Sequence, residues 1–148
     1  MRRFIAGVLV TALAVVAAAC SGSSDSSSPS TQAASAATVT CRTVSGTDDV
    51  GQKLTFSGCT GPTGGTGTVM GPFASPTVIH WASGGTTQVV FDSNMQQTGT
   101  PTCPTQLTIM DGRVVASTEA GITGAVHGTF CIDDARSVSL APGSTFAL

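Results

Sequence analysis

The chain contains no tyrosine and a single tryptophan, Trp81, and only 9% of its residues are charged, against an average of about 25%. Aromatic side chains supply the stacking surfaces on which many sugars and single-stranded nucleic acids bind. Their scarcity argues against a lectin or a single-strand binder. The six basic residues, which include Arg2 and Arg3, form no cluster of the kind that binds phosphate backbones. Nucleic acid is therefore not an expected partner.

Motifs of catalysis and metal binding are also missing. The chain has no G-x-S-x-G, no H-E-x-x-H and no C-x-x-C. Gly65-Thr66-Gly67 lacks the remainder of a dinucleotide-binding loop. We therefore predict no catalytic residue, no cofactor and no metal site. A triad assembled in space from a serine, a histidine and an aspartate stays open, because sequence spacing does not reveal it.

Long apolar runs are limited to one, at residues 4–16, directly after Arg2 and Arg3. A short basic head, an apolar stretch and small residues before a cleavage point make a secretory signal. The run is shorter than the roughly 20 residues that a helix needs to span a bilayer. We predict a signal peptide over residues 1–19, cut after Ala19.

The sequence Ala17-Ala18-Ala19-Cys20, at the end of this run, resembles the lipobox of bacterial lipoproteins. Most lipoboxes carry leucine where Ala17 stands. The resemblance implies that Cys20 becomes the lipidated, palmitate-bearing first residue of a protein anchored on the outer face of the cell membrane. The alternative is plain secretion, because the same residues satisfy the A-x-A rule.

Two features favour the lipoprotein. The chain has five cysteines, and lipidation of Cys20 leaves four, an even set that can pair. Residues 20–37 are rich in serine, alanine and threonine, as a polar tether between an anchor and a domain would be. Residues 38–148 then form one domain of ordinary size. In composition this domain is similar to small exported proteins of high-GC Gram-positive bacteria, a resemblance that implies no active residues.

The domain consists of short Val-, Thr-, Ile- and Phe-rich runs broken by glycine and proline, and no stretch has helical periodicity with caps. The pattern predicts an all-β fold, either an antiparallel β-sandwich or a partly closed β-barrel. The predicted strands are residues 38–45, 53–57, 66–70, 77–83, 86–92, 106–110, 113–118, 122–132 and 137–140, with 144–147 as an edge.

Several connections carry turn residues. Asp111-Gly112 lies between two apolar runs and predicts a two-residue hairpin, because Asp-Gly tolerates positive φ. Gly84-Gly85 predicts a second hairpin. Asp92-Ser93-Asn94 and Pro142-Gly143 predict turns, and residues 61–67 a loop that enters a strand. In residues 122–130, two glycines on the apolar face predict gaps that a large neighbouring side chain fills, or bends of the sheet.

The four remaining cysteines lie in an oxidising compartment if the chain is exported. Four cysteines allow three pairings. We predict Cys41–Cys59 and Cys103–Cys131, because each pair brackets a local strand-turn-strand unit. Each bridge would stabilise the domain by about 3 kcal/mol.

Two histidines and two acidic pairs are the candidate site residues. His80 and Trp81 are adjacent in a predicted strand, so they point to opposite faces, with Trp81 in the core. His127 is expected on a solvated strand face among threonines. Asp48-Asp49 and Asp133-Asp134 lie in predicted loops, where two carboxylates with carbonyls could hold Ca²⁺. Turn formation and solubility are the simpler roles.

These features together predict a lipid-anchored, extracytoplasmic domain that acts by binding, or as an envelope component, and not by catalysis. Its expected partners are the membrane and an unidentified protein or small molecule. The first alternative is an extracellular hydrolase with a site near His80 or His127. The second is a small-ligand carrier with an apolar cavity inside a barrel, to which the glycine-bearing face of residues 122–130 points.

Overall fold

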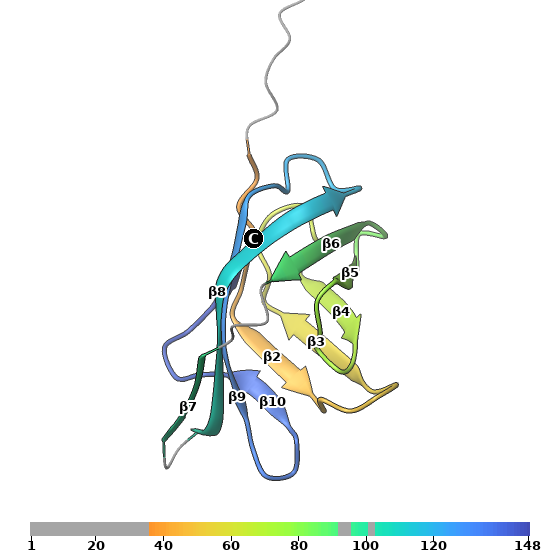
Figure 1. Ribbon diagram of the computed structural model, residues 1–148. Coiled ribbons are helices and arrows are strands. Elements are labelled where there is room, and N and C mark those ends of the chain that lie inside the picture. The colour runs from red at the N-terminus through yellow and green to blue at the C-terminus, as the bar shows by residue number, and fades with distance from the viewer. Residues whose placement is uncertain (1–35, 92–95, 101–102) are drawn as a thin grey trace, which may run out of the picture. The chain divides into compact units, whose positions relative to one another are not determined.

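The computed structural model describes residues 36–91, 96–100 and 103–148, and these form an all-β, antiparallel, nearly closed barrel (Figure 1). Among these residues, no helix has the length and apolar character needed to span a membrane. The strands are β1 (Thr40–Cys41), β2 (Thr43–Gly46), β3 (Lys53–Ser57), β4 (Thr66–Met70), β5 (Thr77–Trp81), β6 (Thr86–Phe91), β7 (Gln96–Thr100), β8 (Cys103–Ser117), β9 (Ala125–Ile132), β10 (Val138–Leu140) and β11 (Phe146–Ala147).

Nine strands follow one another around the barrel in the order β1-β11-β9-β8-β6-β5-β4-β3-β2, and every pairing is antiparallel. The two ends of this path, β1 and β2, are separated by a single residue, Arg42. The sheet therefore returns to where it began. Strand β10 pairs with β9 and β7 with β8, outside the path. The predicted all-β class is confirmed, and a nearly closed barrel is the form it takes.

Alternation along the strands separates the core from the surface. In β5, Thr77, Ile79 and Trp81 are buried while Val78 and His80 are exposed. Apolar side chains from all around the barrel fill its interior, and their burial is the main favourable term in folding. The largest fully buried side chains are Phe56, Phe146, Leu54, Ile79 and Ile122.

Two glycines make room for aromatic rings. A Cβ atom on Gly67 would lie 2.4 Å from the Trp81 ring, and one on Gly128 would lie 3.1 Å from Phe146. The predicted gap in the apolar face of residues 122–130 is thus filled at Gly128 by a neighbouring strand. At Gly124 nothing lies near, and the residue adopts φ +105° just before β9 begins. The residue precedes the strand and is not part of its apolar face.

The turn chemistry predicted several connections correctly. Gly84-Gly85 joins β5 to β6, with the Trp81 amide donating to the Gly85 carbonyl at 2.9 Å. Residues 61–65 form the loop that enters β4, and Pro142-Gly143 forms a turn before β11. The Asp92-Ser93-Asn94 turn falls outside the described residues.

The prediction of a hairpin at Asp111-Gly112 is wrong. Both residues lie inside β8, which runs unbroken for 15 residues. Gly112 has Phe91 of β6 on one side and Val126 of β9 on the other, and the register to β9 shifts between Ile109 and Gly112. The glycine is needed there because a Cβ atom would lie 2.6 Å from the Val126 carbonyl oxygen. Asp-Gly therefore makes an irregularity in a long strand and not a chain reversal.

Both predicted disulfides are present. Cys41–Cys59 links β1 to the loop that follows β3, and Cys103–Cys131 links the start of β8 to β9. Their sequence separations are 18 and 28 residues. Each bridge joins segments that the sheet already holds together, so each closes a local unit, as the sequence predicted.

Candidate functional site

The two histidines lie on the outside of the barrel, on different strands. His80 has Thr68 of β4 and Thr86 of β6 as its cross-strand neighbours. His127 lies opposite Ala147 of β11. Within the described residues, neither imidazole forms a hydrogen bond with a serine or a carboxylate. The described part of the barrel thus assembles no Ser-His-Asp arrangement around either one.

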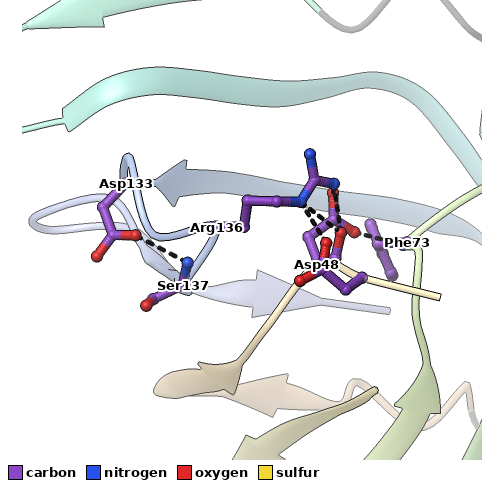
Figure 2. A network of polar contacts seen from close by, with 6 residues as sticks. Asp48, Phe73, Asp133, Arg136 and Ser137 are labelled. Carbon is purple, nitrogen blue, oxygen red and sulfur yellow. Dashed lines mark hydrogen bonds and ion pairs between the residues drawn. The ribbon is translucent and has the colours of Figure 1, made fainter. Parts of the chain in front are cut away.

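The loops that carry the two acidic pairs lie side by side, and Arg136, which the sequence analysis did not single out, links them. Arg136 Nε lies 2.6 Å from Asp49 Oδ1, and its guanidinium also donates to the main-chain carbonyl of Asp48 (Figure 2). Asp133 accepts a hydrogen bond of 2.8 Å from the Ser137 amide. The carboxylates of Asp48, Asp49 and Asp133 each hold a turn or an ion pair, which is the simpler of the two predicted roles.

Metal ligation has no support at these positions. Across the described ranges, no group of three or more His, Cys, Asp or Glu side chains is placed to hold a metal ion. The Asp48 side chain is occupied instead by the Phe73 amide, which donates to its Oδ1 at 2.8 Å. This hydrogen bond joins the loop that follows β2 to the loop that follows β4.

Two hollows lie at the C-terminal end of β8. One, of about 400 Å³, is lined only by residues 114–123, which are the end of β8 and the loop that returns toward β9. The other, of about 220 Å³, lies over the outer face of β5, β6 and β8. Both are open to solvent, and they share three lining residues: Ala116, Ser117 and Thr118. We call the two hollows together the β8 groove.

The backbone of β8 changes its surroundings within this groove. The ladder to β9 ends at the Arg113–Ala125 pair and one further bond, from the Val114 amide to the Gly124 carbonyl. Beyond that point, the described ladders pair residues 116 and 117 with β6. Figure 1 shows this end of β8 running out beside β6, with the loop to β9 arching over it. The edge of β8 that faces away from β6 therefore borders the larger hollow.

A β-bulge aims one apolar side chain out of the barrel here. Gln88 pairs with Ala116 and Val89 with Val114, so Val115 is an extra residue on β8. Val115 is 47% exposed. Val78, which is 39% exposed, lines the smaller hollow. The groove thus combines two exposed valines with the hydroxyls of serine and threonine.

Beneath the groove, a chain of hydrogen bonds runs to the core. The buried Trp81 indole donates to Thr87 Oγ1 at 2.8 Å, and Thr87 Oγ1 lies 2.9 Å from Ser117 Oγ. Ser117 Oγ also accepts from the Glu119 amide and donates to the Thr86 carbonyl. Because its hydrogen-bonding capacity is taken up, Ser117 is a structural hydroxyl and not an activated nucleophile.

Glu119 is the one charged residue that lines the groove. Its carboxylate accepts a hydrogen bond from the Ser83 hydroxyl in the β5–β6 turn, and its side chain packs over Gly85. Sequence reasoning missed this residue. Glu119 and Ser83 are 36 residues apart, and no motif connects them.

No protein-family model, curated protein or solved structure matches the chain.

Proposed function

We propose that the chain is a lipid-anchored extracytoplasmic protein that acts by binding, and that the β8 groove is its binding surface. The observation that carries the proposal is the juxtaposition, in one open groove, of an uncovered strand edge, exposed valines and a carboxylate. Such a combination of apolar area with a few placed polar groups is typical of binding sites.

The location is supported by the cysteines. Two disulfides in a small domain are typical of exported proteins and rare in reducing compartments. The two disulfides use four of the five cysteines, which leaves Cys20 as the odd one. Cys20 is the residue that the lipobox resemblance predicts to carry the acyl chains. Membrane attachment through Cys20 would keep the domain at the outer surface of the cell membrane.

Binding is favoured over the two alternatives by what surrounds the relevant side chains. The hydrolase alternative needs a nucleophile and a base within hydrogen-bond reach, and threonines are the cross-strand neighbours of His80. The carrier alternative needs an apolar cavity inside the barrel. The interior along the described strands holds Phe56, Phe146 and Ile79 at full burial.

The anchor is tested with a Cys20→Ser variant. We expect wild-type protein in the membrane fraction, with the mass of its N-terminus raised by acyl groups, because two or more chains hold a protein stably in a bilayer. The variant should lose both properties and appear in the medium. Wild-type protein found free in the medium with an unmodified Cys20 would contradict the anchoring.

The binding surface is tested by photo-crosslinking in intact cells. A photoreactive residue at Ala116, which is exposed in the groove, should trap a partner from the envelope. The matched control is Ala135, exposed in the turn between β9 and β10. Equal trapping from both positions, or none from Ala116, would reject the groove as the binding surface.

A further inference from the structure

The uncovered edge of β8 identifies a class of ligand. We infer that the β8 groove binds an extended peptide, which adds as a strand to residues 115–117 and places a lysine or arginine against Glu119. The inference deepens the proposed function and depends on the groove being the binding surface. It names the ligand by chemistry: an uncharged, extended backbone with one basic side chain.

The backbone supplies the first part of the argument. A strand edge presents free N–H and C=O groups, which pair readily with another extended chain. Here the described β8–β9 ladder stops at Arg113, and the next bond, at Val114, is made to the loop. Residues 115–117 border a hollow of about 400 Å³ that no other strand lines. Peptide recognition by strand addition uses this kind of edge.

The loop that faces the edge is held in place from below, so the groove exists before a ligand arrives. The Ala37 amide donates to the Gly121 carbonyl at 2.7 Å. Ile122 is fully buried in the core, and Glu119 Oε1 accepts from Ser83. Because residues 118–123 are already held at three points, little conformational entropy is lost in this loop when a peptide binds, and this favours affinity.

Side chains supply the specificity. A strand added to β8 points its side chains alternately to the two faces of the sheet. On the outer face they would meet Val115 and Ala116, which are exposed because of the β-bulge. Small β-branched residues in the peptide fit such a surface, since cross-strand pairs of this type stabilise sheets.

The charge of Glu119 determines which peptide side chain fits beside it. Glu119 lines the groove, and neither hollow is lined by a lysine, an arginine or a histidine. One carboxylate without a cationic partner favours a peptide with one basic side chain and disfavours an acidic peptide. The Ser83 hydroxyl bonds one carboxylate oxygen and fixes the direction in which the other can accept.

The probe is a synthetic peptide, acetyl-Thr-Val-Thr-Lys-Thr-Val-Thr-amide, titrated to millimolar concentration into the ¹⁵N-labelled mature chain with Cys20→Ser. We expect chemical-shift changes at the amides of residues 115–117 and 119. A peptide with glutamate in place of lysine should bind about two- to fivefold more weakly, as expected for one partly exposed ion pair. A peptide methylated on alternate backbone nitrogens should not bind, because methylation removes the donors.

Two variants separate the charge from the fold. Glu119→Gln should reduce the preference for the lysine peptide over the glutamate peptide to none. Asp111→Asn is the matched control, since Asp111 is an exposed carboxylate on β8 that lines neither hollow. It should retain the preference, and the amide spectra of both variants report whether they are folded.

Shift changes confined to other strands, equal binding of the methylated peptide, or no change at millimolar peptide would overturn the inference. Shifts at residues 115–117 that already differ between the full mature chain and one lacking residues 21–35 would show that the tether is the occupant, and would overturn it too. If only the peptide inference is wrong, the photoreactive residue at Ala116 still traps a partner from the envelope. If the proposed function is wrong, no partner is trapped at Ala116.

Discussion

At the scale of single residues, the indole of Trp81 shows how the core and the groove are connected. Trp81 is buried, and its N–H group needs an acceptor that the apolar interior does not offer. Thr87 provides it from the neighbouring strand, and Thr87 in turn meets Ser117 at the floor of the groove. Two hydroxyls therefore allow a large amphipathic ring to lie inside the barrel.

A Thr87→Val substitution tests this arrangement. Valine keeps the shape of threonine but removes the acceptor, so the buried indole N–H loses its partner, and we expect the free energy of unfolding to fall by about 1–3 kcal/mol. Urea denaturation followed by fluorescence measures this directly, because Trp81 is the only tryptophan.

The control for that experiment is Thr55→Val. Thr55 is half-buried on the outer face of β3, and its hydroxyl has no described hydrogen bond. The change should stay within about 0.5 kcal/mol. Equal losses in the two variants would mean that the Thr87 hydroxyl contributes nothing specific.

At the scale of elements, local patterns predicted most strands but failed where distant partners decide. β3 and β4 begin and end where their alternation and flanking glycines indicated. Asp111-Gly112 has ideal hairpin chemistry, yet β6 and β9 pair with Gly112 from either side, and β8 continues through both residues. Pairing with strands that are distant in the sequence overrides the preference of Asp-Gly for a hairpin turn. No feature of the local sequence reveals that pairing.

Other misses have the same physical origin. Strand β7 has the sequence Gln-Gln-Thr-Gly-Thr, without any apolar alternation, and it is a strand because β8 offers it an edge. The β8 groove forms where the β5–β6 turn meets the loop before β9. Glu119 and Ser83 come together there through the pairing of β6 with β8. What the sequence did predict, the exposure of both histidines and both disulfides, depends only on neighbours along one or two strands.

Removal of one disulfide at a time tests the elements that they join. We expect Cys41→Ala with Cys59→Ala, or Cys103→Ser with Cys131→Ser, to lower the free energy of unfolding by about 3 kcal/mol, because each releases a closed loop in the unfolded chain. Urea denaturation of the mature chain, with the oxidation state checked by mass, gives the value.

Ser139→Ala is the control for the second pair, since Ser139 lies opposite Cys131 on β10 and is exposed. We expect a change within about 0.5 kcal/mol. If both double variants were as stable as the control, the bridges would stabilise nothing beyond the sheet itself.

At the scale of the whole barrel, closure is uneven. β1 pairs with β11, but β2 meets the β10 side through a single bridge, Thr47 with Ser137. Beside this bridge, the Asp48 amide donates to the Arg136 carbonyl at 2.9 Å and the Arg136 guanidinium binds Asp48 and Asp49. In the described residues, the seam between β2 and β10 is therefore joined by this bridge and the neighbouring loop contacts, and not by a strand ladder.

We expect this seam to open before the rest of the barrel. The amides of Thr47 and Asp48 should exchange with deuterium faster than those in the middle of β3 and β4, which have a strand on each side. Arg136→Ala should speed their exchange by about two- to fivefold, the effect of an exposed ion pair.

Arg42→Ala serves as the control for the seam, because Arg42 is exposed and forms no described ion pair. It should leave the Thr47 and Asp48 rates unchanged. Exchange at these two amides as slow as in β4 would mean that the seam is as firmly closed as the paired strands.

If the domain is anchored through Cys20, as we propose, the Cys41–Cys59 bridge has a mechanical consequence. A pull along the leading segment would break the Ala37 bond to Gly121, and would then strip Val39 from its two backbone bonds with Leu148 and Thr40 from β11. The load then reaches Cys41 and passes through the covalent bridge to the end of β3, bypassing β2. Peeling from that terminus stops after a few residues, so shear flow or a moving surface could tug at this protein without unravelling its barrel.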